Sequence, residues 1–316
     1  MAQFIPVGDD SGLLWGGDAN DPERALFKKI KNEGHYGKDP HPDAHGAGND
    51  QGYYALTPSG IFLASSPATD AAGVVKMLKE ALVKWQKLPK EQRLPAEAPA
   101  KNPAGRRRAE QNYPSDGLVL SVNLRDLPRK ELSKDAKMYQ WTWNQDYAWY
   151  SKDEARGWVP ATFTKGATHP VADAIVRRLA RTTFADNVRS ITPPFADGEV
   201  EKARLTATVI ALDRDVAVLR YEGETRTSAS GTWAVGQEPA SKQTRGFDAK
   251  LLGKATYNIK EGKFTSFALV ALGTRWGGTV YNGRTDDLAP APMGITLTLA
   301  GNTPAERVAP FAAYGQ

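Results

Sequence analysis

The sequence contains no cysteine and only four histidines among its 316 residues. The absence of cysteine excludes disulfide bonds, catalytic thiols, iron–sulfur clusters and every zinc site that uses thiolate ligands. Its longest apolar runs are far shorter than the roughly 20 residues that a membrane-spanning helix needs. The first residues, "MAQFIPVGDD", lack a charged region followed by an apolar stretch. We therefore expect a soluble protein without a signal peptide, either cytoplasmic or the processed form of an exported protein.

Motifs that carry common enzymatic chemistry are also missing. There is no Gly-x-Ser-x-Gly nucleophile motif and no phosphate-binding loop, and the glycines of "GAGNDQG" (residues 46–52) are spaced wrongly for dinucleotide binding. The paired aspartates at 213/215 and 286/287 lie in a predicted turn and a predicted loop, where aspartate is common for local reasons. No catalytic constellation is visible, which favours a protein that is not an enzyme.

The composition is that of an ordinary globular protein, with 41% hydrophobic and 24% charged residues. The length permits two domains. The formal net charge of +5 is small for a chain of this size, so a nucleic-acid partner is not indicated.

Periodicity in the first third of the chain predicts the order strand, helix, hairpin, helix. A short strand over residues 2–7 precedes a helix with an apolar stripe. Residues 52–66 contain two β-prone runs around a Pro-containing turn at 57–60, which is typical of a hairpin. Asp70 is placed to cap an amphipathic helix that follows it.

This stretch also carries a resemblance. "GYYALTPSGIFLAS" and "DAAGVVKMLKEALVKW", within residues 52–88, resemble the central hairpin and closing helix of a thioredoxin-like domain. The whole chain resembles uncharacterised bacterial two-part proteins that join a truncated domain of this kind to a β-rich one. The resemblance implies a thioredoxin-like βαββα fold for residues 1–88. It implies no thiol redox activity, because the Cys-x-x-Cys motif is missing.

Residues 89–115 hold five prolines and almost no apolar side chains, which predicts a linker. Residues 116–316 form a second domain. They begin with a strand at 117–124 and a tryptophan-rich segment, and continue through a short helix capped by Ser151 and a longer helix over 170–184 with His169 at its cap. Alternating strands follow residue 200 and predict a mainly antiparallel sheet, either curved or closed into a barrel. The fold class is therefore α+β.

A histidine-rich loop at residues 34–50 is the candidate metal site. His35, His41, His45 and Asp43 supply imidazole and carboxylate groups that bind copper or zinc. The spacing matches no specific metal motif, and an ordinary surface loop explains the same composition.

The tryptophan-rich segment is the candidate ligand site. Exposed Trp141, Trp143 and Trp149 would stack on sugar rings, as aromatic side chains do in carbohydrate-binding proteins. The alternative is an aromatic core that also includes Trp158, and this is the favoured interpretation of the segment.

Three functions stay open at this point. The first is a non-catalytic binding or accessory protein whose partner is an unknown small molecule, glycan or protein. The second is a copper- or zinc-dependent protein that uses the histidine-rich loop. The third is a carbohydrate-binding protein that uses the tryptophan-rich segment.

Overall fold

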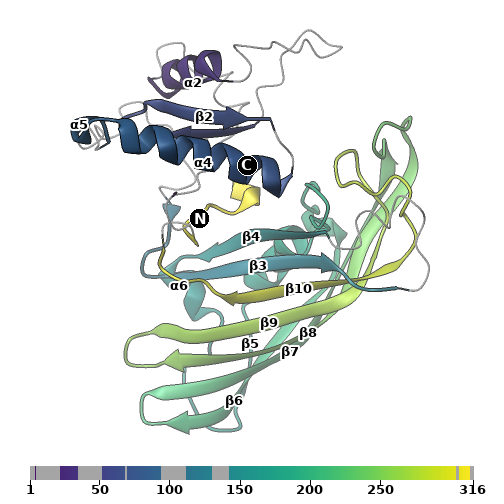
Figure 1. Cartoon of the computed structure of the whole chain (residues 1–316). Coiled ribbons are helices and arrows are strands. Elements are labelled where there is room, and N and C mark those ends of the chain that lie inside the picture. Colours follow the sequence, from purple (N-terminus) through teal and green to yellow (C-terminus); the bar gives the residue numbers. More distant parts are fainter. Residues whose placement is uncertain are drawn as a thin grey trace. The chain divides into compact units, whose positions relative to one another are not determined.

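The computed structural model of the chain describes residues 4, 22–34, 52–67, 70–93, 112–129, 142–303 and 306–313 (Figure 1). Contacts divide the chain into two compact units. One comprises residues 8–107, and the other comprises residues 1–7 together with 108–316. Within the described residues, no helix combines the length and apolarity needed to cross a membrane.

The smaller unit contains a two-stranded antiparallel sheet and helices on either side of it in the sequence. Its elements are α2 (Pro22–Glu33), β1 (Tyr53–Leu56), β2 (Phe62–Ser66), α4 (Ala71–Lys87) and the short α5 (Lys90–Arg93).

The predicted hairpin is confirmed. Gly60 donates its N–H to the carbonyl of Thr57 at 2.9 Å and has a φ of 80°, a conformation that side-chain-bearing residues rarely adopt. The strand expected over residues 2–7 lies outside the described residues, except for Phe4.

Helix α4 forms as its sequence predicts. The Asp70 carboxylate accepts the Gly73 N–H at 2.8 Å and so satisfies one of the unpaired donors at the helix start. Met77 and Ala81 are buried on one side of the helix. Lys84 extends along the hairpin and donates to the carbonyl of Leu63 at 2.5 Å, so that the helix and β2 are joined by packing and by a polar contact.

The larger unit is built on one eight-stranded sheet in which every pairing is antiparallel. The spatial order is β4-β3-β10-β9-β8-β7-β6-β5. The strands are β3 (Leu118–Asp126), β4 (Trp143–Tyr150), β5 (Thr168–Pro170), β6 (Val200–Asp213), β7 (Val216–Trp233), β8 (Ser241–Asn258), β9 (Lys263–Trp276) and β10 (Ala291–Leu299). Strands β4 and β5 end the sheet without pairing with each other, so it is open and the barrel alternative does not hold.

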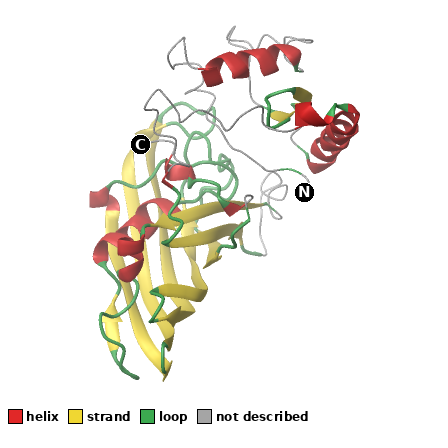
Figure 2. Cartoon of the chain, turned by 90° about the vertical axis from the view of Figure 1, so that its left-hand side faces the viewer, coloured by secondary structure: helices red, strands yellow, loops and turns green. Residues whose placement is uncertain are grey.

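Alternation along the strands gives the sheet two different faces. One face, called here the covered face, carries apolar side chains such as Leu120, Leu269 and Leu297, which belong to the main core. Residues 151–199 pack against it through α6 (Lys152–Arg156), α7 (Asp173–Arg178) and η3 (Leu179–Thr183), as the two perpendicular views show (Figures 1 and 2). The opposite face is called here the open face.

Trp158 is the centre of this core. It is fully buried, and its ring makes edge-to-face contacts with Tyr150, Tyr221 and Phe267 at centroid distances of 5.1 to 6.0 Å. The Tyr221 hydroxyl donates to the Trp158 carbonyl at 3.1 Å. The prediction that this tryptophan belongs to an aromatic core is confirmed. These four residues are called here the aromatic cluster.

The capping box predicted at Ser151 is present. The Ser151 hydroxyl accepts the Glu154 N–H, and the Glu154 carboxylate accepts the Ser151 N–H at 2.7 Å. The helix predicted over residues 170–184 is present in part: α7 and η3 follow each other directly from Asp173 to Thr183, but the predicted start at residue 170 is wrong.

His169 and Pro170 lie in the edge strand β5 and not at a helix cap. The helical part starts later and widens into the π-helix η3, in which Phe184 donates to the Leu179 carbonyl at 2.8 Å. The Thr182 hydroxyl bonds the Arg178 carbonyl at 2.8 Å, a side-chain bond that competes with regular helical pairing.

The open face mixes charge and apolar side chains. Leu252, Val270 and Leu272 are exposed on adjacent strands, beside Glu224, which is paired with Lys250, Lys202 and Arg204. Such a face is typical of a solvent-facing antiparallel sheet.

Candidate ligand-binding pocket

The predicted metal ligands His35, His41, His45 and Asp43 all lie outside the described residues, so the copper or zinc site stays a prediction. In the part of the chain that the structure describes, no three histidine, aspartate or glutamate side chains are grouped to hold a metal.

Two of the three predicted ligand-binding tryptophans, Trp143 and Trp149, lie within the described residues. Trp141 lies outside the described residues. Trp143 and Trp149 are six residues apart on β4, about 20 Å at the usual rise of a strand. Trp143 is 61% exposed, whereas Trp149 is half-buried and packs edge-to-face on Tyr113 at 5.3 Å. The exposed Trp143 is therefore the only one of the two described side chains that is open to a ligand.

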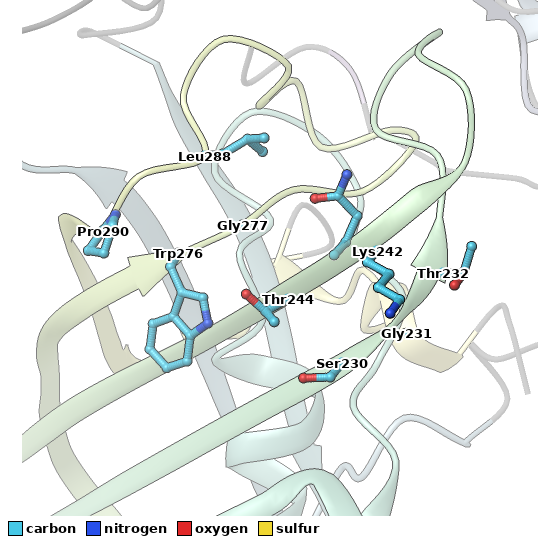
Figure 3. Close-up of a pocket in the computed structure, with 10 residues that line it drawn as sticks. Ser230, Gly231, Thr232, Lys242, Thr244, Trp276, Gly277, Leu288 and Pro290 are labelled. Carbon is cyan, nitrogen blue, oxygen red and sulfur yellow. The ribbon is translucent and has the colours of Figure 1, made fainter.

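A pocket of about 680 Å³ lies on the open face, where β7 and β9 end and β8 begins (Figure 3). Its lining combines one indole, three hydroxyl groups, one amide, one ammonium group and two apolar side chains. The lining residues are Ser230, Gly231, Thr232, Lys242, Gln243, Thr244, Trp276, Gly277, Leu288 and Pro290.

Trp276 is the one aromatic side chain among the ten residues that line the pocket. In the ladder it stands opposite Gly246, and a side chain at Gly246 would meet the indole ring at 2.1 Å. The absence of a Cβ at Gly246 thus lets the ring lie directly on the strand. The Arg226 guanidinium is 5.7 Å from the ring centroid and is itself bonded to Asp248 and Glu201.

Strand register places the polar groups in rows beside this ring. Ser230 pairs with Thr244, and Thr232 pairs with Lys242, all on the face that carries Trp276. The residues on β8 that line the pocket therefore extend away from the indole in steps of two residues. Figure 3 shows Trp276 and Lys242 at opposite ends of the pocket, with Thr244 between them.

The loop over residues 277–290 forms the remaining wall through Leu288 and Pro290. Two hydrogen bonds fix its start: the Gly277 N–H donates to the Leu288 carbonyl at 2.8 Å, and the Trp233 indole N–H donates to the Gly278 carbonyl at 2.8 Å. A second set of contacts, made by charged side chains on the covered face, fixes the rest of the loop.

Seven charged side chains make up this set, called here the ionic cluster. They are Asp126, Arg129, Asp186, Arg189, Arg275, Arg284 and Asp287.

Arg284, which is completely buried, is the central residue of the ionic cluster. Its guanidinium makes paired hydrogen bonds to both oxygens of Asp126, at 2.8 Å each, and to both oxygens of Asp186, at 2.8 and 2.7 Å. Bidentate bonds of this kind fix orientation as well as distance. The loop is therefore held to the end of β3 and to the segment after η3.

Asp287 ties the same loop to β9. Its carboxylate accepts from Arg275 and Arg189, each at 2.5 Å, and from Arg129 at 2.6 Å. Arg275 also donates to the Asp287 carbonyl and to the carbonyl of Ala289 at 3.2 Å. The carbonyls that Arg275 bonds belong to the residues that immediately precede Leu288 and Pro290, so these bonds hold the wall of the pocket in place without a ligand.

The electrostatics of the ionic cluster favour the charged forms of its acids. Burial acts to raise the pKa of Asp287, but hydrogen bonds from Arg275 and Arg129 outweigh it and hold that pKa at about 2. At Asp126 burial likewise acts to raise the pKa, but the hydrogen bonds and charge of Arg284 outweigh it and the pKa is lowered. Burial and the neighbouring Arg284 lower the pKa of Arg275.

Comparisons with known proteins found no match to this chain among family models, characterised proteins or solved structures. The geometry of the described residues therefore carries the functional argument.

Sequence reasoning named none of the pocket residues as ligand-binding, and it missed the ionic cluster. It placed Asp286 and Asp287 in a loop at a sheet edge, which agrees with the structure, but nothing in the sequence paired Asp287 with arginines up to 158 positions away. The only local sequence feature that could have indicated the pocket was the pair Trp276-Gly277, in which an aromatic residue at the end of a strand is followed by a turn.

Proposed function

We propose that this protein is a non-catalytic carbohydrate-binding protein and that the pocket beside Trp276 is its binding site. The observation that carries the proposal is a flat indole on a sheet surface with hydroxyl groups in register beside it. Sugars have apolar ring faces and polar edges, so they are suited to an aromatic platform with hydrogen-bonding groups around it.

The chemistry of the lining supports binding without reaction. Among the ten lining residues there is no carboxylate and no imidazole, so the pocket offers no pair of groups for acid–base hydrolysis of a glycosidic bond. Its groups are those that orient a ligand: hydroxyls, an amide and an aromatic surface.

The rigid surroundings of the pocket also support the proposal. The Leu288 and Pro290 wall is fixed by the ionic cluster, and Trp276 is fixed by its contact with Gly246. A preformed site loses little conformational entropy on binding, which favours affinity for weakly interacting ligands such as sugars.

The test is a glycan array with the purified full chain, followed by titration calorimetry with the glycans that bind. Trp276→Ala is expected to weaken binding about thirtyfold, because a buried aromatic anchor contributes on the order of 2 kcal/mol. Thr244→Val, which removes one hydroxyl from the lining without changing its volume, should weaken it less.

Trp143→Ala is the matched control, because Trp143 is an exposed tryptophan on the same open face but at its other edge. It should leave affinity unchanged. Loss of binding in Trp143→Ala with retention in Trp276→Ala would instead support the site first predicted in the tryptophan-rich segment. Circular dichroism should confirm that both variants fold.

For residues 1–88 we propose a shortened thioredoxin-like arrangement. It is supported by the β1-β2 hairpin followed by α4 packed on it. An experimental structure of residues 1–88 in which a third strand pairs with the hairpin would support the proposal. A structure in which the hairpin pairs with no further strand would refute it.

A further inference from the structure

The lining of the pocket carries one positive charge and no negative charge, which indicates the class of sugar that it would bind. Lys242 is the only charged residue in the lining, and it is exposed. Among the described residues it has no ion-pair partner. By contrast, Arg226 at the opposite end is neutralised by Asp248 and Glu201.

Two exposed cations elsewhere on the open face have acidic neighbours. Lys250 bonds Glu224 at 2.7 Å, and Arg220 bonds Glu222 at 3.0 Å. Lys254, on the same strand and face, resembles Lys242 in having no ion pair among the described residues, but of these two lysines only Lys242 lines the pocket.

Register also gives the distance between this charge and the aromatic platform. Lys242 is four residues along β8 from Gly246, on which the Trp276 ring lies, and this corresponds to about 13 Å at 3.3 Å per residue. A ligand that stacks on the indole and reaches the ammonium group is longer than one sugar ring. Ser230 and Thr244, paired across β7 and β8, lie in between and can bond hydroxyls of the intervening ring.

We propose that the pocket binds an acidic oligosaccharide, with one ring on Trp276 and a carboxylate or sulfate group of another ring on Lys242. This inference rests on the proposed carbohydrate-binding function and specifies its ligand. Carboxylated and sulfated sugars share the anionic chemistry, and the experiment separates them.

The experiment uses the full chain and titration calorimetry with four probes. They are tetragalacturonic acid, its fully methyl-esterified neutral form, a sulfated chondroitin tetrasaccharide and monomeric galacturonic acid. The wild-type protein should prefer at least one acidic tetrasaccharide to the neutral ester by about fivefold at low salt, the size expected for one solvent-exposed charge pair. The monomer should bind most weakly because it cannot reach both groups.

Two variants and a control assign the preference to one side chain. Lys242→Gln should remove the preference and leave affinity for the neutral ester unchanged, while Lys242→Arg should keep it. Lys254→Gln, an exposed lysine on the same strand outside the pocket, should have no effect. In 1 M salt the preference should vanish, because the Debye length falls to about 3 Å.

The outcomes distinguish failure of the acidic-ligand inference from failure of the proposed carbohydrate-binding function. Equal binding of acidic and neutral tetrasaccharides by the wild type, or a preference that survives in Lys242→Gln, would overturn the acidic-ligand inference and leave the carbohydrate site standing. Failure of all four probes and of every glycan on the array to bind would refute both.

Discussion

The aromatic cluster around Trp158 and the ionic cluster around Arg284 lie on the same face of one sheet, and both are buried, but different forces hold them. The aromatic cluster consists of ring contacts that depend mainly on shape and burial. The ionic cluster consists of directional bonds between charges that lost their hydration on folding. The first stabilises the sheet against its helices, and the second fixes where one loop lies.

The two clusters therefore contribute differently to the free energy of unfolding and to the position of the loop. Replacing an apolar contact by a similar one changes the free energy of unfolding by a small amount, because packing tolerates changes of the same volume. A buried ion pair contributes little net stability, yet loss of one partner leaves a charge without compensation. The region next to the proposed binding site is therefore the one in which position is specified most strictly.

The largest effect is expected when the ionic cluster loses its central cation. Arg284→Met leaves Asp126 and Asp186 without their main partner, and we expect a loss of about 5 kcal/mol in the free energy of unfolding. Urea denaturation measures it. The control is Arg220→Met, which removes an exposed pair with Glu222 on the open face and should cost less than about 1 kcal/mol.

A loss at Arg284 no larger than that of the control would mean that water reaches the cluster and that the comparison drawn above is wrong. Arg284→Lys, which retains charge but not the bidentate geometry, distinguishes the two contributions. It should restore part of the stability and leave the affinity of the pocket reduced, because the loop wall is no longer fixed.

The aromatic cluster should give the next largest effect. Trp158→Ala removes the central ring and is expected to cost about 4 kcal/mol, whereas Trp158→Phe should cost clearly less because it keeps most of the packing. The measurement is again urea denaturation, with ligand affinity determined for the folded fraction. In contrast to the Arg284 variants, affinity should be retained. A Trp158 variant that folds but binds weakly would show that the two clusters are coupled.

The smallest of the three effects concerns acid stability. The folded pKa of Asp287 is about 2, below its ordinary value of 3.8, so its contribution is present above pH 4 and is lost as pH falls toward 2. This contribution is about 2 kcal/mol. Thermal denaturation between pH 5 and pH 2 measures it, with Asp287→Asn as the comparison. The variant should be less stable at pH 5 and should lose less stability on acidification; identical pH profiles would contradict the assignment.

Local signals in the sequence were sufficient for several elements. The Asp70 cap, the Ser151 capping box and the turn ending at Gly60 depend on residues within a few positions of one another, and each formed as predicted. Strands with clear alternation, such as β3, were also predicted because a half-buried strand imposes a period of two.

Other elements were missed because their secondary structure depends on pairing with residues far away in the sequence. The second half of β7, "ETRTSASGTW", is polar enough to suggest a loop, yet it pairs with β8 along its whole length. The helix expected over residues 170–184 begins only at Asp173, because Pro170 is taken up by the edge of the sheet through β5. These outcomes depend on tertiary contacts that override local preference.

By itself, the sequence determined that this chain is an α+β protein without thiol chemistry and with an antiparallel sheet in its second part, because composition and period are local properties. Only the tertiary structure decided which tryptophan is buried and which forms a platform, and it alone gathered the arginines and aspartates of the ionic cluster. Trp158 and Trp276 are residues of the same type in different environments. The Trp276 ring lies against Gly246, which strand register places opposite it, whereas the Trp158 ring is surrounded by other aromatic rings. Register joins residues that lie far apart in the chain, and no short stretch of sequence records it.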